Sequence, residues 1–379
     1  MMSFIVDLLP HLEETFEITL LGVKTDSQNY YSDFIELNGK KYPFKVFSEV
    51  VTGKKKVPNI LRVVYNLWRG KKKILKGDYD LLYIHGIPLN LPLLKGRGTH
   101  NQSPKIINHV HGSTNPFSVT NKRSLPYSIL AKIYSGYRQK VVRNSDLVLL
   151  ASDKVGHEKF SSDFQPATAK HIKYIPNFAD SGVFRQRDKL EARKQLDLSS
   201  TIKIFISAGR LSFQKDPILS LEAFAQSRLG EPENAHLYFI GEGELSQQLQ
   251  ELVNEKNLGE YVHFLGRLER TEIAIWLNAA DVFVYTSHGN GFPIALVEAG
   301  MSGLPIVTTD VTGVHDIVIH GSTGFLVEHR DIKELSFYMH KALKQNHILS
   351  KNILVQSKRF TPENIAHKIS EFLRSSLIS

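Results

Sequence analysis

Short runs of aliphatic and β-branched residues alternate with stretches of helical periodicity along the whole chain. Several of these runs are continuously apolar, which is typical of strands that are covered on both faces of a sheet. In the first half of the chain, strands are expected at 17–23, 81–85, 105–110, 147–151 and 171–175. In the second half, they are expected at 202–208, 235–240, 262–264, 282–285, 306–308 and 324–327.

Helical patterns lie between the strands of the second half, at 217–226, 245–256, 272–280 and 294–301. This alternation predicts parallel sheets flanked by helices, so the fold class is α/β with two doubly wound, Rossmann-like domains in series. Turn residues at 176–180 separate an N-terminal domain at 1–177 from a C-terminal domain at 178–360. The amphipathic tail at 361–379 predicts a separate helix outside the second sheet that packs back toward the N-terminal domain.

The chain begins with a helical pattern made by Phe4, Ile5, Leu8, Leu9 and Leu12. A doubly wound domain that binds a ligand usually opens instead with a strand and a glycine-rich turn. The first domain is therefore expected to lack its opening strand and glycine loop, either because the recorded chain starts late or because the domain is truncated.

Composition narrows the class of protein. The 379 residues are 42% hydrophobic and 22% charged, which excludes disorder as the dominant state. The absence of Cys excludes disulfides, thiolate zinc sites, iron–sulfur clusters and a cysteine nucleophile. No apolar run reaches the ~18–20 residues that span a bilayer, and residues 1–7 lack the basic start of a signal peptide. A cytoplasmic protein is expected.

Positive charge is concentrated in the first half of the chain. Residues 1–180 contain 26 Lys and Arg against 15 Asp and Glu, whereas residues 181–379 contain 21 against 23. The basic residues form clusters at 40–41, 54–56 and 69–73, followed by Lys76. Each cluster alone is equally compatible with a solvated face. Together they favour an anionic partner surface, such as the inner face of a membrane. No helix–turn–helix, zinc or RNA-binding signature is present, so nucleic acid is not an expected partner.

The densest group of informative residues lies at 286–300, where a strand leads into a helix. Gly289 and Gly291 permit close backbone approach, and the helix that begins near Pro293 offers free N–H groups to an anion such as a diphosphate. Glu298, one turn further on, could accept hydrogen bonds from sugar hydroxyls. The alternative interpretation is a capped surface turn with a solvated glutamate.

A second group lies at 207–217, where a strand ends and Gly209 turns the chain. Arg210 and Lys215 follow before the next helix, and two cations at the carboxyl end of a strand could clamp a diphosphate leaving group. Structural ion pairing is the alternative. A third turn, Gly241-Glu-Gly243, fails as a dinucleotide fingerprint because Ser246 stands at its sixth position, so only a tight turn near a nucleotide base is expected.

Two further motifs are weaker. Asp78-Tyr79-Asp80 resembles a metal-binding Asp-x-Asp, but it precedes a strand and is interpreted as a turn. His109 and His111 lie on one face of a strand without a third ligand nearby in the sequence, so no metal site is predicted. His111 is placed where the chain leaves the sheet, a position from which it could face a cleft between the two domains.

Several motifs, in the same order along the chain, resemble those of glycosyltransferase family four (glycosyl transferases group one), whose members are retaining enzymes of the GT-B fold. The similarity is strong from about residue 172 to the end and weaker before it, at His109–Gly112 and Pro176-Asn177. The motifs are Gly209-Arg-Leu-x3-Lys215-Asp-Pro, Gly241-Glu-Gly, Phe264-Leu-Gly-Arg267, Gly291-Phe-Pro-x4-Glu298-Ala, Gly303-Leu-Pro-Ile-Val, Thr309-Asp310 and Gly321-x2-Gly324-Phe-Leu-Val.

The resemblance implies two domains that face each other across a cleft and a role for each matching residue. Arg210 and Lys215 would hold the diphosphate of a nucleotide-sugar donor, and His111 would contact the sugar near its anomeric centre. Glu298 would bind the ribose. The remaining donor-binding positions are Gly209, Gly241, Gly243, Gly266, Arg267, Gly291, Phe292, Pro293 and Ile294, with Gly266 and Arg267 at the base. A UDP-sugar is favoured over a GDP-sugar, and neither a metal nor another cofactor is implied.

Two positions depart from the family pattern. Asn290 stands where the family has a Glu that faces the donor sugar, so it is assigned to the catalytic residues, with reduced or altered sugar selectivity expected. Asp316 replaces another Glu. The expected function is transfer of a sugar, with retention, to a glycan or lipid-linked acceptor in cell-surface polysaccharide biosynthesis, at the inner face of the cytoplasmic membrane. The alternative is a catalytically inactive GT-B scaffold or a nucleotide-binding interaction protein.

Overall fold

The computed structural model describes residues 2–24, 34–37, 39–49, 74–75, 78–85, 104–111, 125–228, 234–289, 292–328 and 331–378. The chain divides into two compact units. The first comprises Met1–Ala151, His157–Ile175 and Ala366–Ser379, and the second comprises Ser152–Gly156 and Pro176–Ile365. The change at 175/176 lies two residues before the boundary that the sequence predicts, and most of the C-terminal helix α14 (Pro362–Ile378) belongs to the first unit.

The second unit is built on a parallel sheet of six described strands. These are β8 (Lys203–Ala208), β9 (Ala235–Ile240), β10 (Val262–Phe264), β11 (Val282–Tyr285), β12 (Ile306–Thr309) and β13 (Gly324–Val327). Their spatial order is β10-β9-β8-β11-β12-β13, so the direction of winding reverses between β8 and β11. Ligands of doubly wound sheets bind at this point, beyond the carboxyl ends of the strands.

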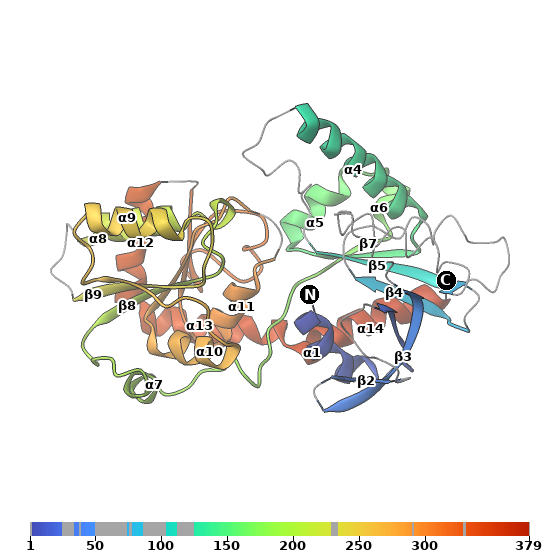
Figure 1. The fold of residues 1–379 in the computed structure, drawn as a ribbon, viewed down its shortest axis with the longest axis horizontal. Coiled ribbons are helices and arrows are strands. Elements are labelled where there is room, and N and C mark those ends of the chain that lie inside the picture. Colours follow the sequence, from blue (N-terminus) through green and yellow to red (C-terminus); the bar gives the residue numbers. More distant parts are fainter. Residues whose placement is uncertain are drawn as a thin grey trace. The chain divides into compact units, whose positions relative to one another are not determined.

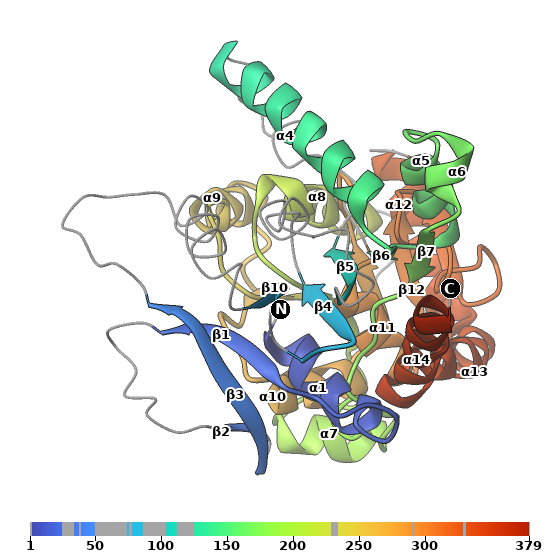
Figure 2. The ribbon, with the colours of Figure 1, turned by 90° about the vertical axis from the view of Figure 1, so that its right-hand side faces the viewer.

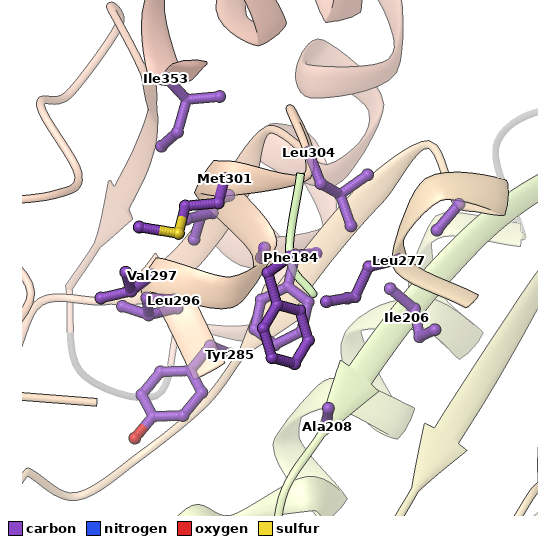
Figure 3. Close-up of a cluster of buried hydrophobic side chains, with 14 of the residues drawn as sticks. Phe184, Ile206, Ala208, Leu277, Tyr285, Leu296, Val297, Met301, Leu304 and Ile353 are labelled. Carbon is purple, nitrogen blue, oxygen red and sulfur yellow. The ribbon is translucent and has the colours of Figure 1, made fainter. Parts of the chain in front are cut away.

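Helices cover both faces of this sheet. One layer contains α8 (Pro217–Arg228), α9 (Ser246–Glu255) and α12 (Ile332–Lys344), and the opposite layer contains α10 (Arg270–Ala279), α11 (Ile294–Met301) and α13 (Asn346–Ser357) (Figure 1). Helix α7 (Lys189–Gln195) packs against α10. Successive residues of β8 point to opposite faces, so Phe205 enters the core under α8 and Ile206 enters the core under α10 and α11. Figure 3 shows part of the core under α10 and α11. The apolar centre of β8, residues 204–206, is therefore buried on both faces of the sheet, as predicted.

The first unit contains a parallel sheet of β4 (Leu81–His85), β5 (Lys105–His111), β6 (Leu147–Ala151) and β7 (Ile172–Ile175), paired in that order. The described helices that accompany it are α4 (Leu125–Asn144), α5 (Lys154–Ser161) and the short α6 (Pro166–Ala169). Its core is formed by residues such as Val110, Val148 and Phe160. These strands also lie where the sequence places them, within one residue at each end.

The N-terminal part differs from the prediction in one respect. Helix α1 (Met2–Leu12) is followed by β1 (Leu20–Lys24), as expected, but β2 (Phe34–Leu37) and β3 (Lys40–Glu49) form an antiparallel hairpin that was not predicted. The three strands make a separate sheet in the order β1-β3-β2 (Figure 2). Because β1 pairs with β3, it does not serve as an opening strand of the β4–β7 sheet. The missing strand and glycine loop remain a prediction. Over the ranges described above, no helix is long and apolar enough to cross a bilayer.

Candidate functional site

The loop after β8 contains the two predicted cations at the carboxyl edge of the sheet. It is held to the last residue of β9 by a hydrogen bond from Gly209 N to Ile240 O (2.9 Å), and to the loop after β9 by one from Leu211 N to Glu242 O (3.1 Å). Arg210 is exposed and makes no ion pair with any residue that the structure describes. Lys215 ends a single 3₁₀ turn, Phe213–Lys215, and is partly buried.

A tyrosine from the neighbouring strand fixes the position of Lys215. Lys215 Nζ donates a hydrogen bond of 2.6 Å to Tyr285 Oη, and it also lies 5.0 Å from the centroid of the Tyr285 ring. The ring belongs to the apolar core, while its hydroxyl oxygen points away from the labelled side chains of that core (Figure 3). Tyr285 was not predicted as a site residue, because the last residue of an apolar strand resembles an ordinary core residue.

The loop after β11 is fastened to the loop after β8. Thr286 Oγ1 donates to Asp216 O (2.7 Å), Ser287 Oγ donates to Gln214 O (3.1 Å), and the backbone N–H of residue 288 donates to the same carbonyl (3.0 Å). The His288 ring stacks on Phe213, with 4.8 Å between centroids. This loop leads to Asn290 and Gly291, which lie outside the described residues.

Helix α11 begins immediately beyond this loop, with Pro293 at its N-cap position. The Phe292 carbonyl accepts a 2.6 Å hydrogen bond from Asn177 Nδ2, and the Phe292 ring packs 5.3 Å from that of Phe360. The Phe292 side chain is thus a buried anchor for the helix start, so any contact it makes with a donor would come from its backbone. Ile294, the first helical residue, is exposed.

A pocket of about 450 Å³ opens beside the ends of β8 and β9. It brings together four of the predicted donor-binding residues: Gly209, Gly241, Arg267 and Glu298. The other lining residues are Ala208, Ile240, Leu268, Glu269, Glu272, Ile273 and Ala295. Glu269 and Glu272 were not predicted as part of a site. Their signal is the Glu-x-x-Glu spacing of a capping box at the start of α10, where Glu272 Oε2 accepts from Glu269 N at 2.8 Å.

Glu298 has an unusual environment for a carboxylate. Burial raises its pKa to about 7, and the Arg270 guanidinium offsets only part of this rise. Burial opposes the ionisation of this carboxyl group, and a neutral Gln of similar size would avoid the cost of burying a charge. A carboxyl group kept in such a pocket is therefore a candidate functional group. Glu298 lines the pocket, and its role toward sugar hydroxyls remains a prediction.

The glycines of the third motif have a structural role in the described fold. A Cβ on Gly241 would lie 2.1 Å from Gly209 O, and one on Gly243 would lie 2.2 Å from Leu211 O. Gly241 also has a φ of +122°, and its N–H donates to Gly266 O at 2.7 Å. Both glycines therefore let the loops after β8 and β9 approach closely. Of the two, only Gly241 lines the pocket.

The candidate residues of the first unit are less completely described. His111 ends β5, and its side chain is not described. His109 is buried, and its Nδ1 lies 2.6 Å from Tyr83 Oη. Asp78 and Asp80 lie in the bend before β4. No set of three His, Asp or Glu side chains in the described parts of the chain could hold a metal ion.

The basic clusters fall mostly on residues that the structure does not describe. Those at 54–56 and 69–73, with Lys76, lie outside the described ranges. In the remaining cluster, Lys40 forms an ion pair with Glu13 and is not fully available to an external anion.

Comparisons with known proteins show what the chain is similar to. Residues 188–360 match the family model "Glycosyl transferases group 1". The N-acetyl-alpha-D-glucosaminyl L-malate synthase of Bacillus anthracis is 27% identical over 252 residues, 66% of this chain and 62% of that protein. The chain spans less than two thirds of the length of the first curated relatives that it matches.

Two solved structures share the fold over most of their length. Sucrose-phosphate synthase from Thermosynechococcus elongatus superposes with a TM-score of 0.74 and 20% identity, covering 98% of this chain and 91% of that one. Anabaena HepE in complex with UDP-glucose has a TM-score of 0.66 and 22% identity, covering 88% and 86%. Residues 188–360 are therefore similar to the glycosyl transferases group 1 family, and the chain has the GT-B fold.

Proposed function

We propose that this chain transfers a sugar from a nucleoside diphosphate donor to an acceptor hydroxyl. The observation that supports it best is the meeting of four features where the strand order reverses. Lys215 and Arg210 follow β8, α11 begins just beyond the loop after β11, and the pocket with Glu298 adjoins both. Cations, a helix N-terminus and a pocket with a carboxylate match the diphosphate, its charge and the ribose of such a donor.

The proposed reaction breaks the bond between the anomeric carbon and the diphosphate oxygen and forms a bond from that carbon to the acceptor oxygen. The acceptor loses a proton, and the diphosphate leaves with an additional negative charge. Lys215 and Arg210 stabilise this charge as it develops, and the held ammonium of Lys215 needs little rearrangement to do so. The resemblance to retaining enzymes supports retention at the anomeric carbon, and it implies that His111 and Asn290 would contact the sugar.

The nucleoside is proposed to occupy the pocket. Glu298 would accept hydrogen bonds from the ribose hydroxyls, and Arg267 would lie beside the base. UDP is the favoured nucleotide, which is consistent with the UDP-glucose complex of HepE. No step of this scheme is assigned to a metal or another cofactor, since the two cations and the helix N-terminus supply the required positive charge.

The acceptor is proposed to be a glycan or lipid-linked saccharide of cell-surface polysaccharide biosynthesis, met at the inner face of the cytoplasmic membrane. The basic N-terminal half of the sequence supports that location. Reversal of the three Lys residues at 54–56 to Glu should weaken binding to anionic vesicles without changing the thermal unfolding of the protein. Equal vesicle binding by the reversed and native proteins would remove the membrane from the proposal.

The function is tested by measuring release of nucleoside diphosphate from a panel of nucleotide-sugars. An active transferase releases it slowly even without acceptor, whereas an inactive scaffold does not. Asn290 distinguishes the two further, because Asn290→Ala should lower activity while Asn290→Glu should keep activity or change the preferred sugar. An inactive native protein that gains turnover as Asn290→Glu would establish the scaffold instead.

A further inference from the structure

A histidine of the second unit faces a carboxylate with each of its two ring nitrogens. His315 Nδ1 lies 2.9 Å from Asp153 Oδ2, and its Nε2 lies 2.7 Å from Asp310 Oδ1. A neutral imidazole has one N–H group and can donate to only one of these oxygens, whereas the imidazolium donates to both. The arrangement therefore fits a protonated His315.

The first of these carboxylates is fully buried. The Asp153 side chain is 0% exposed, and it also accepts hydrogen bonds from Gly156 N (2.7 Å) and Gly313 N (2.8 Å). Burial by itself would raise the pKa of Asp153, but the hydrogen bonds from His315, Gly156 and Gly313 lower it below its usual range. A buried carboxylate is costly without a counter-charge, and the His315 ring forms an ion pair with Asp153 among the described residues.

His315 and Asp310 stand near the two ends of the loop that follows β12, at 310–316. Thr309, the last residue of β12, accepts a hydrogen bond from Ser287 N and donates one to Ser287 O, both of 3.0 Å. The loop also lies against the loop after β11, since a Cβ on Gly289 would be 3.9 Å from Val311 Cβ. The order of one loop can therefore affect the other.

We propose that His315, held as an imidazolium between Asp153 and Asp310, is a positioning residue that fixes the loop after β12 and, through Thr309 and Ser287, the donor-binding loop after β11. The inference rests on the proposed function only in that the molecule bound beside the loop after β11 is taken to be the sugar donor. His315 is not assigned a contact with substrate. Its effect on donor binding is exerted through the backbone of residues 286–289.

This role makes donor binding depend on pH in a definite direction. Within the described residues, the charged groups that face the ring are Asp153, from the segment before α5, and Asp310, from its own loop. The hydrogen bond to Asp153 raises the pKa of His315, burial opposes the rise, and Asp310 adds to it. The loop is therefore fixed at pH below this raised value and loosens as the pH increases through it, when one of the two hydrogen bonds is lost.

The test is hydrogen–deuterium exchange of the full chain without ligand, at pH 6.5 and 8.5, expressed as protection relative to the unstructured rate. The variants are His315→Gln and Asp310→Asn. The control is His320→Gln, an exposed histidine of the same unit that contacts Leu326, Tyr338 and Phe325. We expect both variants to lose about tenfold protection at 286–289 and 310–316 at pH 6.5, the scale of one hydrogen bond to a charged group. The native protein should show the same loss at pH 8.5, and the control should match the native protein at both pH values.

Titration of UDP and GDP under the same conditions provides the second readout. At pH 6.5 the native protein should bind the better-bound nucleotide about tenfold more tightly than His315→Gln does. At pH 8.5 the two proteins should bind it equally, and the comparison at each pH cancels the contribution that Glu298 makes to both. Unchanged protection at 286–289 in both variants, or native protection that does not depend on pH, overturns the inference. If neither nucleotide binds the native protein while the exchange pattern is as expected, the proposed function fails and the positioning of the loop stands.

Discussion

Lys215 Nζ and Tyr285 Oη are 2.6 Å apart, and they join the loop after β8 to the end of β11 across the point where the strand order reverses. Tyr285 is 6% exposed, and its ring is held by the core, so it offers a fixed acceptor to an otherwise flexible lysine. A charge that is already in place loses little entropy when a diphosphate arrives. The relationship explains how a short 3₁₀ turn can present an ammonium group at a defined position.

Removal of either predicted cation should impair transfer far more than folding. We expect Lys215→Ala and Arg210→Ala each to lower turnover by roughly 10²–10³-fold, the scale for loss of one preorganised charge stabiliser. Steady-state release of nucleoside diphosphate measures the effect, with Lys194→Ala, an exposed cation on α7, as the matched control. Near-normal turnover in either site variant would show that the leaving group binds elsewhere.

Tyr285→Phe isolates the anchoring of Lys215. The ring that packs in the core is retained and only the hydroxyl is lost, so thermal stability should change little. The lysine remains but is less well oriented, and we expect kcat/KM to fall by about tenfold, corresponding to one hydrogen bond to a charged group. The effect should disappear when Lys215 is already Ala, so the double variant should equal the single one. Additive losses in that double-mutant cycle would separate the two residues functionally.

Glu298 should give both activity and stability a measurable pH dependence. Its pKa of about 7 lies above the ordinary value of 4.5, so the native state binds the proton more tightly than the unfolded state between these values. Stability must therefore fall as the pH rises from about 4.5 through about 7. Glu298→Gln should remove this fall and unfold at a higher temperature than the native protein at pH 8, with no such advantage at pH 4.

The same substitution should act in the opposite direction on the donor. Because the ionised carboxylate is the stronger acceptor for ribose hydroxyls, kcat/KM of the native protein should decline as the pH falls below about 7. Glu298→Gln should be less active at pH 8 and lack that decline. A Gln variant with native activity across the range would remove Glu298 from the ribose site, even if the stability measurement agrees.

Gly241 offers a test of the loop packing that is independent of function. A Cβ there would lie 2.1 Å from a backbone oxygen, at a φ of +122° that side chains rarely adopt. We expect Gly241→Ala to lower the free energy of unfolding by about 2–4 kcal/mol, as for strain and overpacking combined. Gly259→Ala is the control, since that glycine has no atom within 4 Å of an added Cβ. Denaturant unfolding measures the free energy of unfolding of both variants. If Gly241→Ala were as stable as Gly259→Ala, the close contact between the two loops would be contradicted.

The sequence predicted much of the sheet structure for a physical reason. Short apolar runs such as 204–206 and 282–285 are typical of strands that helices cover on both faces, and both runs lie in strands of the second unit. The hairpin of β2 and β3 was not predicted, because Lys40, Lys41 and Pro43 interrupt the apolar pattern within β3. The local signal that could have found the hairpin is Asn38-Gly39, a two-residue Asn-Gly connection between the paired residues Leu37 and Lys40.

The site could be predicted only where a residue type shows its chemistry. Arg210, Lys215 and Glu298 stand out as charges beside glycine turns, and the structure places them around one edge of the sheet. Tyr285 and His315 could not be found this way, because their roles depend on partners that are distant in sequence, 70 residues away for Lys215 and 162 for Asp153. Such partners become visible only when the chain is folded.

Titration of nucleotides that differ by one phosphate tests the proposed site most directly. UDP and UMP, and in parallel GDP and GMP, are titrated calorimetrically into the native protein and into Lys215→Ala. If the second unit clamps a diphosphate, one diphosphate should bind the native protein at least about tenfold more tightly than its monophosphate, and Lys215→Ala should lose most of that preference. Absence of binding by either diphosphate, or a preference that survives the loss of Lys215 unchanged, would contradict the account.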